Sequence, residues 1–98
     1  MDKAEQKRIK REMREKEKQA FIDSLPMSKE LFDELFDRLD EKLDKQGCDG
    51  TLNITLEFLE NKGIRASKVV EWMKKYGGYC DCEVLANVED PFNRFGLF

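Results

Sequence analysis

Four leucines spaced four residues apart constrain the fold of this 98-residue chain more than any other feature. On an α-helix this spacing places the four side chains on one face, which must be buried against the rest of the protein. The hydroxyl of Ser28 can cap the start of such a helix, and Gly47 can end it. The leucines are Leu31, Leu35, Leu39 and Leu43. The sequence therefore predicts an amphipathic helix between Ser28 and Gly47.

The first nineteen residues offer few large apolar side chains to the core, because they hold eight Lys or Arg and five Asp or Glu. They carry a net charge of +3, whereas the remainder of the chain carries −6. Opposite charges four residues apart, such as Arg8 with Glu12, stabilise a solvated helix by only about 0.2–0.5 kcal/mol per pair. We expect this charged helix to run from Lys3 to about Ile22, before Pro26.

Residues 51–58 alternate polar and apolar side chains, as a half-buried strand does, yet their leucines also fit one face of a helix. Asp49 can cap a helix here and Gly63 can end it. The total length of 51–62 favours the helix, although the strand stays open.

A further helix is predicted over 67–76, ended by a Gly-Gly pair. The next segment, 79–88, alternates apolar and polar side chains and is predicted to be a strand. A strand needs a partner for its backbone groups. The candidates are residues 51–58, the C-terminal tail, or the same strand of a second copy.

These elements predict a mainly helical α+β fold, with three amphipathic helices and one short C-terminal strand. We divide the chain into a charged helical arm (1–25), a small α+β domain (26–90) and an aromatic tail (91–98). No apolar run is long enough to cross a bilayer, and the start of the chain is too charged for a signal peptide. We therefore expect a cytoplasmic protein whose cysteines are not structural disulfides.

Three cysteines are the chemically distinctive residues of the chain. A strand places Cys80 and Cys82 on one face, roughly 7 Å apart, where they can share a metal. Cys48 lies just beyond a helix end, and an oxygen from Asp49 or Asp81 can complete a tetrahedral Zn²⁺ site. The Cys-x-Cys spacing departs from the usual Cys-x-x-Cys, and the chain has no histidine. The simplest interpretation is that the cysteines are small core residues. The metal site is the second interpretation, and a redox-sensing thiol is the third.

No catalytic constellation is recognisable, because the chain lacks histidine, a nucleophile elbow and a phosphate-binding loop. We therefore predict that the protein is not an enzyme. The basic arm and the two helices joined at Gly63 allow weak nucleic-acid binding. The acidic remainder of the chain argues against it.

The run Gly-Gly-Tyr-Cys-Asp-Cys-Glu-Val-Leu-x-Asn at 77–87, with the segments 47–52 and 70–72, resembles a small bacterial family. This is the domain-of-unknown-function family numbered 2695, and the resemblance covers about residues 30–89. It implies no established activity, and it favours the helix in the ambiguous segment. Family members often carry a histidine where this chain has Gly50. The resemblance therefore implies that a metal here has an acid or water as its fourth ligand, or that no metal binds.

The sequence as a whole favours a non-enzymatic protein-interaction module, which meets an unknown partner or a second copy through the strand edge or the aromatic tail. The alternative is a zinc-binding or thiol redox-sensing domain that uses Cys48, Cys80 and Cys82. Weak nucleic-acid binding through the basic arm is the second alternative.

Overall fold

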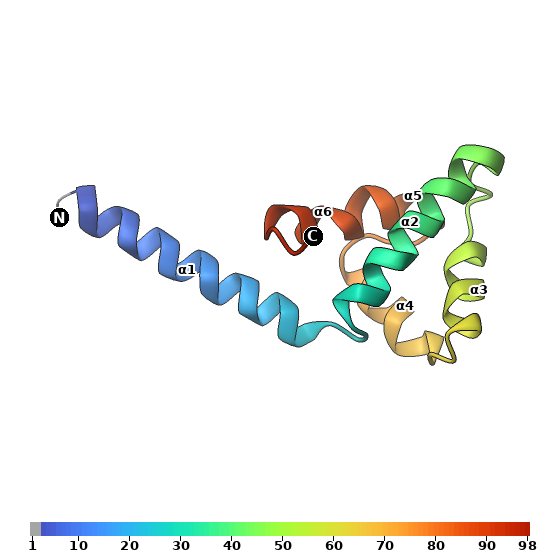
Figure 1. Ribbon diagram of the computed structural model, residues 1–98, viewed down its shortest axis with the longest axis horizontal. Helices are drawn as coiled ribbons and strands as arrows, with labels where there is room; N and C mark the ends of the chain where they lie inside the picture. Colours follow the sequence, from blue (N-terminus) through green and yellow to red (C-terminus); the bar gives the residue numbers. More distant parts are fainter. Residues whose placement is uncertain (1–2) are drawn as a thin grey trace.

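The computed structural model describes the backbone of residues 3–98 and the side chains of residues 14–98. Its helices follow one another along the chain, and the last three elements form one continuous helical run (Figure 1). The elements are α1 (Lys3–Ser24), α2 (Lys29–Gln46), α3 (Asn53–Asn61), α4 (Ala66–Lys75), α5 (Asp81–Glu83), the π-helical turn η1 (Val84–Val88) and α6 (Glu89–Arg94).

The α+β prediction is wrong, because all regular elements within residues 3–98 are helical and none is a strand. The segment 79–88 turns into the run of α5 and η1 instead of extending. Its alternation was misleading, since Val84, Val88 and Phe92 are also spaced four apart and so share one face of a helix. All three side chains are completely buried. The strand edge expected to bind a partner therefore has no counterpart in the described residues.

Helix α2 confirms the prediction drawn from the leucine spacing. The Ser28 hydroxyl accepts a hydrogen bond from the Leu31 amide at 3.3 Å. Gly47 has a positive φ of 71°, and its amide donates to the Leu43 carbonyl at 2.9 Å. The segment 51–62 is also helical and forms α3, which confirms the helix that the sequence favoured over a strand.

An aromatic cluster at the centre of the core joins the two ends of the chain. Phe92 of α6 is fully buried, and its ring centroid lies 5.0 Å from those of Phe21 in α1 and Phe32 in α2. It also stacks on Phe98 at 5.1 Å. At Phe92, therefore, the aromatic tail docks on the body of the protein.

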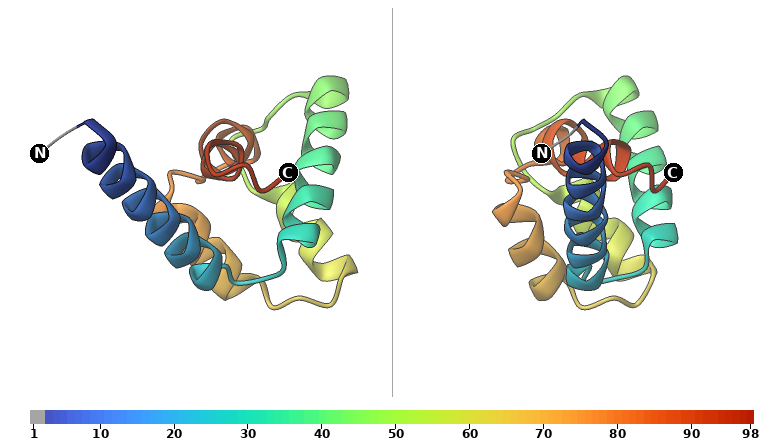
Figure 2. Two further views of the ribbon diagram at one scale, coloured as in Figure 1. Left: turned by 60° about the vertical axis from the view of Figure 1, so that its left-hand side comes forward. Right: turned by 90° about the vertical axis from the view of Figure 1, so that its left-hand side faces the viewer.

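Helix α1 contacts the rest of the molecule chiefly through its C-terminal end and extends away from it (Figures 1 and 2). Trp72 of α4 donates its indole N–H to the Ser24 hydroxyl at 3.2 Å. The ion pair expected between Arg8 and Glu12 lies outside the described side chains, as does most of the basic arm.

Among the described residues, no helix combines the length and the apolar character needed to cross a membrane.

The turn between α4 and α5 lies directly against η1, which explains its two glycines. A Cβ on Gly78 would approach the Val88 Cγ2 atom to 2.8 Å, closer than real side chains come. Gly77 has a φ of 85°, and its carbonyl accepts a hydrogen bond from the side-chain amide of Asn87 at 3.0 Å. The π turn also comes just before Pro91, whose ring would crowd the Asn87 carbonyl in a regular helix.

We expect Phe92→Ala to lower the free energy of unfolding by about 3–5 kcal/mol, the usual range for truncating a buried phenylalanine. Phe98→Ala is the matched control, since it removes the same atoms from a side chain that is 51% exposed. Urea denaturation followed by Trp72 fluorescence measures both. Equal losses in the two variants would contradict a core centred on Phe92.

Candidate metal centre

Three cysteines from two distant parts of the sequence meet where the loop between α2 and α3 passes the start of α5. Cys48 follows the glycine that ends α2, and Cys80 and Cys82 flank the first residue of α5. The three Sγ atoms all lie within 4.8 Å of one another. We call Cys48, Cys80 and Cys82 the cysteine trio.

The two cysteines of the Cys-x-Cys motif lie closer together than a strand would place them. Cys80 is the extended residue before α5, with φ −143° and ψ 169°, and Cys82 lies in the helix. Their Sγ atoms are therefore only 3.2 Å apart, yet well beyond the covalent S–S length of about 2.05 Å. Cys80 is buried, whereas Cys48 and Cys82 are exposed. The interpretation as core residues thus holds for Cys80 alone.

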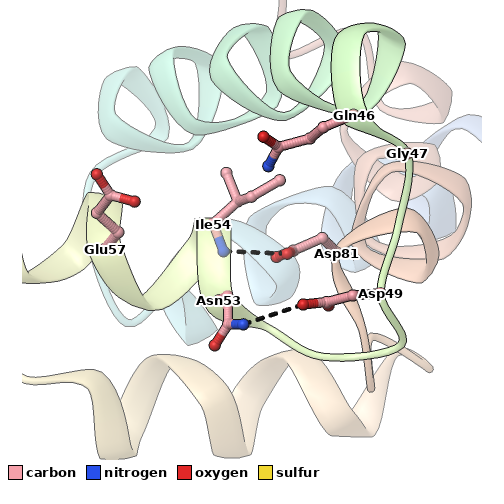
Figure 3. A pocket seen from close by; sticks show the side chains of 7 residues that line it. All are labelled: Gln46, Gly47, Asp49, Asn53, Ile54, Glu57 and Asp81. Carbon is pink, nitrogen blue, oxygen red and sulfur yellow. Dashed lines mark hydrogen bonds between the residues drawn. The ribbon is translucent and has the colours of Figure 1, made fainter.

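Asp81, between the two cysteines, fixes their position through a contact with α3. Its carboxylate is 1% exposed and accepts a hydrogen bond from the Ile54 amide at 3.0 Å (Figure 3). It also accepts hydrogen bonds from the Thr55 amide at 3.1 Å and the Thr55 hydroxyl at 2.7 Å. The Asp81 amide donates in turn to the Thr51 carbonyl at 2.9 Å. The first amides of a helix lack partners within it and favour a negative charge. Asp81 therefore caps α3 from a distant part of the chain.

Asp49 shapes the loop that carries Cys48. Its carboxylate accepts hydrogen bonds from the Thr51 hydroxyl, from the Thr51 amide at 3.0 Å and from the Asn53 side-chain amide at 3.0 Å. These contacts, the Thr51 hydroxyl first, hold the pKa of Asp49 below its ordinary value. The expected cap by Asp49 is not formed, since α3 begins after Leu52 and takes its acceptor from Asp81.

A pocket of about 240 Å³ lies behind this loop, between the end of α2 and the start of α3 (Figure 3). It is lined by Gln46, Gly47, Asp49, Asn53, Ile54, Glu57 and Asp81, without any residue of the trio. Both aspartates there are already engaged in the hydrogen bonds described above. The pocket and the cysteine trio are therefore two separate features.

The surroundings of Cys48 and Cys80 shift their pKa values in opposite directions. Backbone N–H groups of Cys82 and then of Gly50 donate to the Cys48 sulfur and lower its pKa. The Glu83 backbone N–H pulls the pKa of Cys80 down. The hydrogen bond with Cys82, burial, the Glu83 carboxylate and Cys48 outweigh it and raise that pKa to about 12. A thiolate therefore forms more readily at Cys48 than at Cys80.

The structure brings together the three predicted cysteines but does not add either predicted aspartate to them. The Asp49 and Asp81 carboxylates are committed to α3 and its preceding loop. Sequence reasoning missed Glu83, whose Oε1 lies 3.3 Å from the Cys80 sulfur. Once the segment is known to be helical, the spacing of three between Cys80 and Glu83 indicates this contact.

Fold and site define a small domain, helical throughout its described elements, with a cluster of three cysteines at its surface. A family model described as "Protein of unknown function (DUF2695)" matches residues 35–87, more than half of the chain. The chain belongs to this family, which confirms the resemblance seen in the sequence.

Two similar proteins are "Uncharacterized protein Mb2294" of Mycobacterium bovis and "Uncharacterized protein Rv2271" of Mycobacterium tuberculosis. Each is 36% identical over 52 residues, which cover 53% of this chain and 52% of the relative. The chain thus spans about half the length of these relatives. No solved structure matches it.

We expect Asp81→Asn to lower the free energy of unfolding by about 1–3 kcal/mol, because an amide N–H₂ would then face the donors at the start of α3. Asp49→Asn is the matched control, since its carboxylate also accepts three hydrogen bonds but in an exposed loop. Urea denaturation with chelator and reductant present measures both. A loss at Asp81 no larger than that at Asp49 would argue against the buried cap.

In metal-free, reduced protein near neutral pH we expect iodoacetamide to modify Cys48 first and Cys80 last. The lowered pKa of Cys48 increases its thiolate fraction, and the thiolate is the nucleophile. Cys80 stays protonated until the pH approaches about 12, and it is buried. Timed alkylation and peptide mass mapping give the order. Modification of Cys80 before Cys48 would disprove this arrangement.

Proposed function

We propose that this protein is a zinc-binding domain in which the cysteine trio supplies three thiolate ligands. The observation that carries the proposal is the approach of the three Sγ atoms to within 4.8 Å of one another. Zn–S bonds of about 2.3 Å in a tetrahedral site place neighbouring sulfurs roughly 3.8 Å apart. Small side-chain rotations therefore suffice to bring the trio around one ion.

The chemistry of the donors favours zinc over hard cations. Thiolates select soft or borderline-soft metals, whereas Mg²⁺ and Ca²⁺ prefer oxygen. The Gly50 backbone N–H donates to the Cys48 sulfur at 3.4 Å and can stabilise the charge of a bound thiolate. Such surrounding hydrogen bonds orient metal ligands and raise affinity.

A metal held here would link two segments that are far apart in the sequence. Cys48 lies in the loop after α2, and Cys80 and Cys82 lie at the start of α5. The binding free energy of a site that exists only in the folded state adds to the stability of that state. We therefore assign the metal a stabilising role in a chain too small to bury a large core.

The other functions expected from the sequence stay predictions. The segment that was to offer a strand edge is helical, and Phe92 of the aromatic tail is buried. Protein binding therefore rests on exposed apolar side chains, which among the described residues include Leu56, Tyr79 and Phe98. Nucleic-acid binding rests on the basic arm, most of whose side chains lie outside those described. Thiol redox sensing would use the same trio as zinc.

We expect reduced protein, purified without a histidine tag, to bind one equivalent of Zn²⁺ and to melt at a higher temperature when loaded. Cys48→Ser and Cys82→Ser each remove a proposed ligand, so each is expected to weaken zinc binding at least about 100-fold. Competition with a chromophoric chelator measures the affinity, and calorimetry measures the melting temperature.

All three cysteines belong to the trio, so the control for these variants is Glu89→Gln. The Glu89 carboxylate contacts Asn93 rather than the trio. We expect it to bind zinc nearly as well as the unaltered chain. Failure of the unaltered chain to bind zinc, or affinity indifferent to both cysteine changes, would refute the proposal. Ready formation of a disulfide in the trio without zinc binding would favour the redox alternative.

A further inference from the structure

We propose that Glu83 supplies the fourth ligand of this metal site. The inference rests on the proposed function and deepens it, since three thiolates leave one position of a tetrahedral Zn²⁺ open. A carboxylate oxygen is an accepted zinc ligand at about 2.0–2.2 Å.

The other candidate ligands are absent or already committed. The chain contains no histidine. The Asp81 carboxylate is buried, and turning it toward the trio would remove the acceptor of the first amides of α3. The Asp49 carboxylate holds Thr51 and Asn53 in the loop that positions Cys48. Either movement would break the structure that brings the sulfurs together.

Glu83, by contrast, already contacts one member of the trio. Its Oε1 is 3.3 Å from the Cys80 sulfur. In a tetrahedral site with Zn–S of about 2.3 Å and Zn–O of about 2.0 Å, oxygen and sulfur lie roughly 3.5 Å apart. The observed spacing from Cys80 therefore matches coordination, and the proposal requires the glutamate side chain to rotate toward Cys48 and Cys82 when the metal binds.

The test compares Glu83→Gln and Glu83→Ala with Glu89→Gln in full-length protein. Glu89 lies on the same helical run and contacts Asn93 rather than the trio. Glu89→Gln removes one negative charge, as Glu83→Gln does, and is therefore the matched control. We expect both Glu83 variants to weaken zinc binding at least about tenfold, and the Glu89 variant to match the unaltered chain. We also expect the ligand-field absorption of the Co²⁺-loaded protein to change only in the Glu83 variants. Circular dichroism checks that each variant is folded.

The outcomes separate this inference from the function on which it rests. If the unaltered chain fails to bind zinc, the proposed function itself fails. If the unaltered chain binds zinc and both Glu83 variants keep its affinity and its cobalt spectrum, Glu83 is not a ligand. The trio would then hold the metal with water or another group in the fourth position.

Discussion

The site depends on the hydrogen bonds between the buried carboxylate of Asp81 and the start of α3. Helix α3 begins without a side-chain cap of its own, because its N-cap residue is Leu52. Asp81 supplies the missing acceptor and takes the Ile54 and Thr55 amides together with the Thr55 hydroxyl. Since Asp81 stands between Cys80 and Cys82, the contact that completes α3 also sets the position of both sulfurs. An otherwise local helix start thereby determines the geometry of a surface cluster.

The parts of the fold that could be predicted are those whose signals are local. Helix α2 could be placed from three local signals. These are the leucines four residues apart, the capping serine Ser28 and the terminating glycine Gly47. The segment 79–88 was assigned wrongly because residues four apart lie on the same face of a strand and also on the same face of a helix. Val84 and Val88 therefore fit both structures equally well. The sequence around Asp81 gives no sign that a carboxylate there will meet the start of a helix so much earlier in the chain. Its capping role required the tertiary structure.

The candidate site was predicted in part and by a wrong route. The sequence indicated that Cys48, at a helix end, can join Cys80 and Cys82, and the three sulfurs do meet. The geometry differs, because a helix start rather than a strand brings Cys80 and Cys82 together. The run that carried the family resemblance now has two physical explanations. Its glycines and asparagine allow the turn to pack against η1, as Gly78 shows, and its two cysteines join Cys48 to form the trio.

X-ray absorption at the zinc edge of loaded, untagged protein tests the central claim most directly, because it measures the bonds themselves. If the trio binds the metal, the first shell contains three sulfurs at about 2.3 Å and one lighter atom at about 2.0 Å. Changing Cys82 to serine should then lower the number of sulfurs. A first shell made only of oxygen and nitrogen would show that zinc binds elsewhere and would contradict the assignment of Cys48, Cys80 and Cys82 as its ligands.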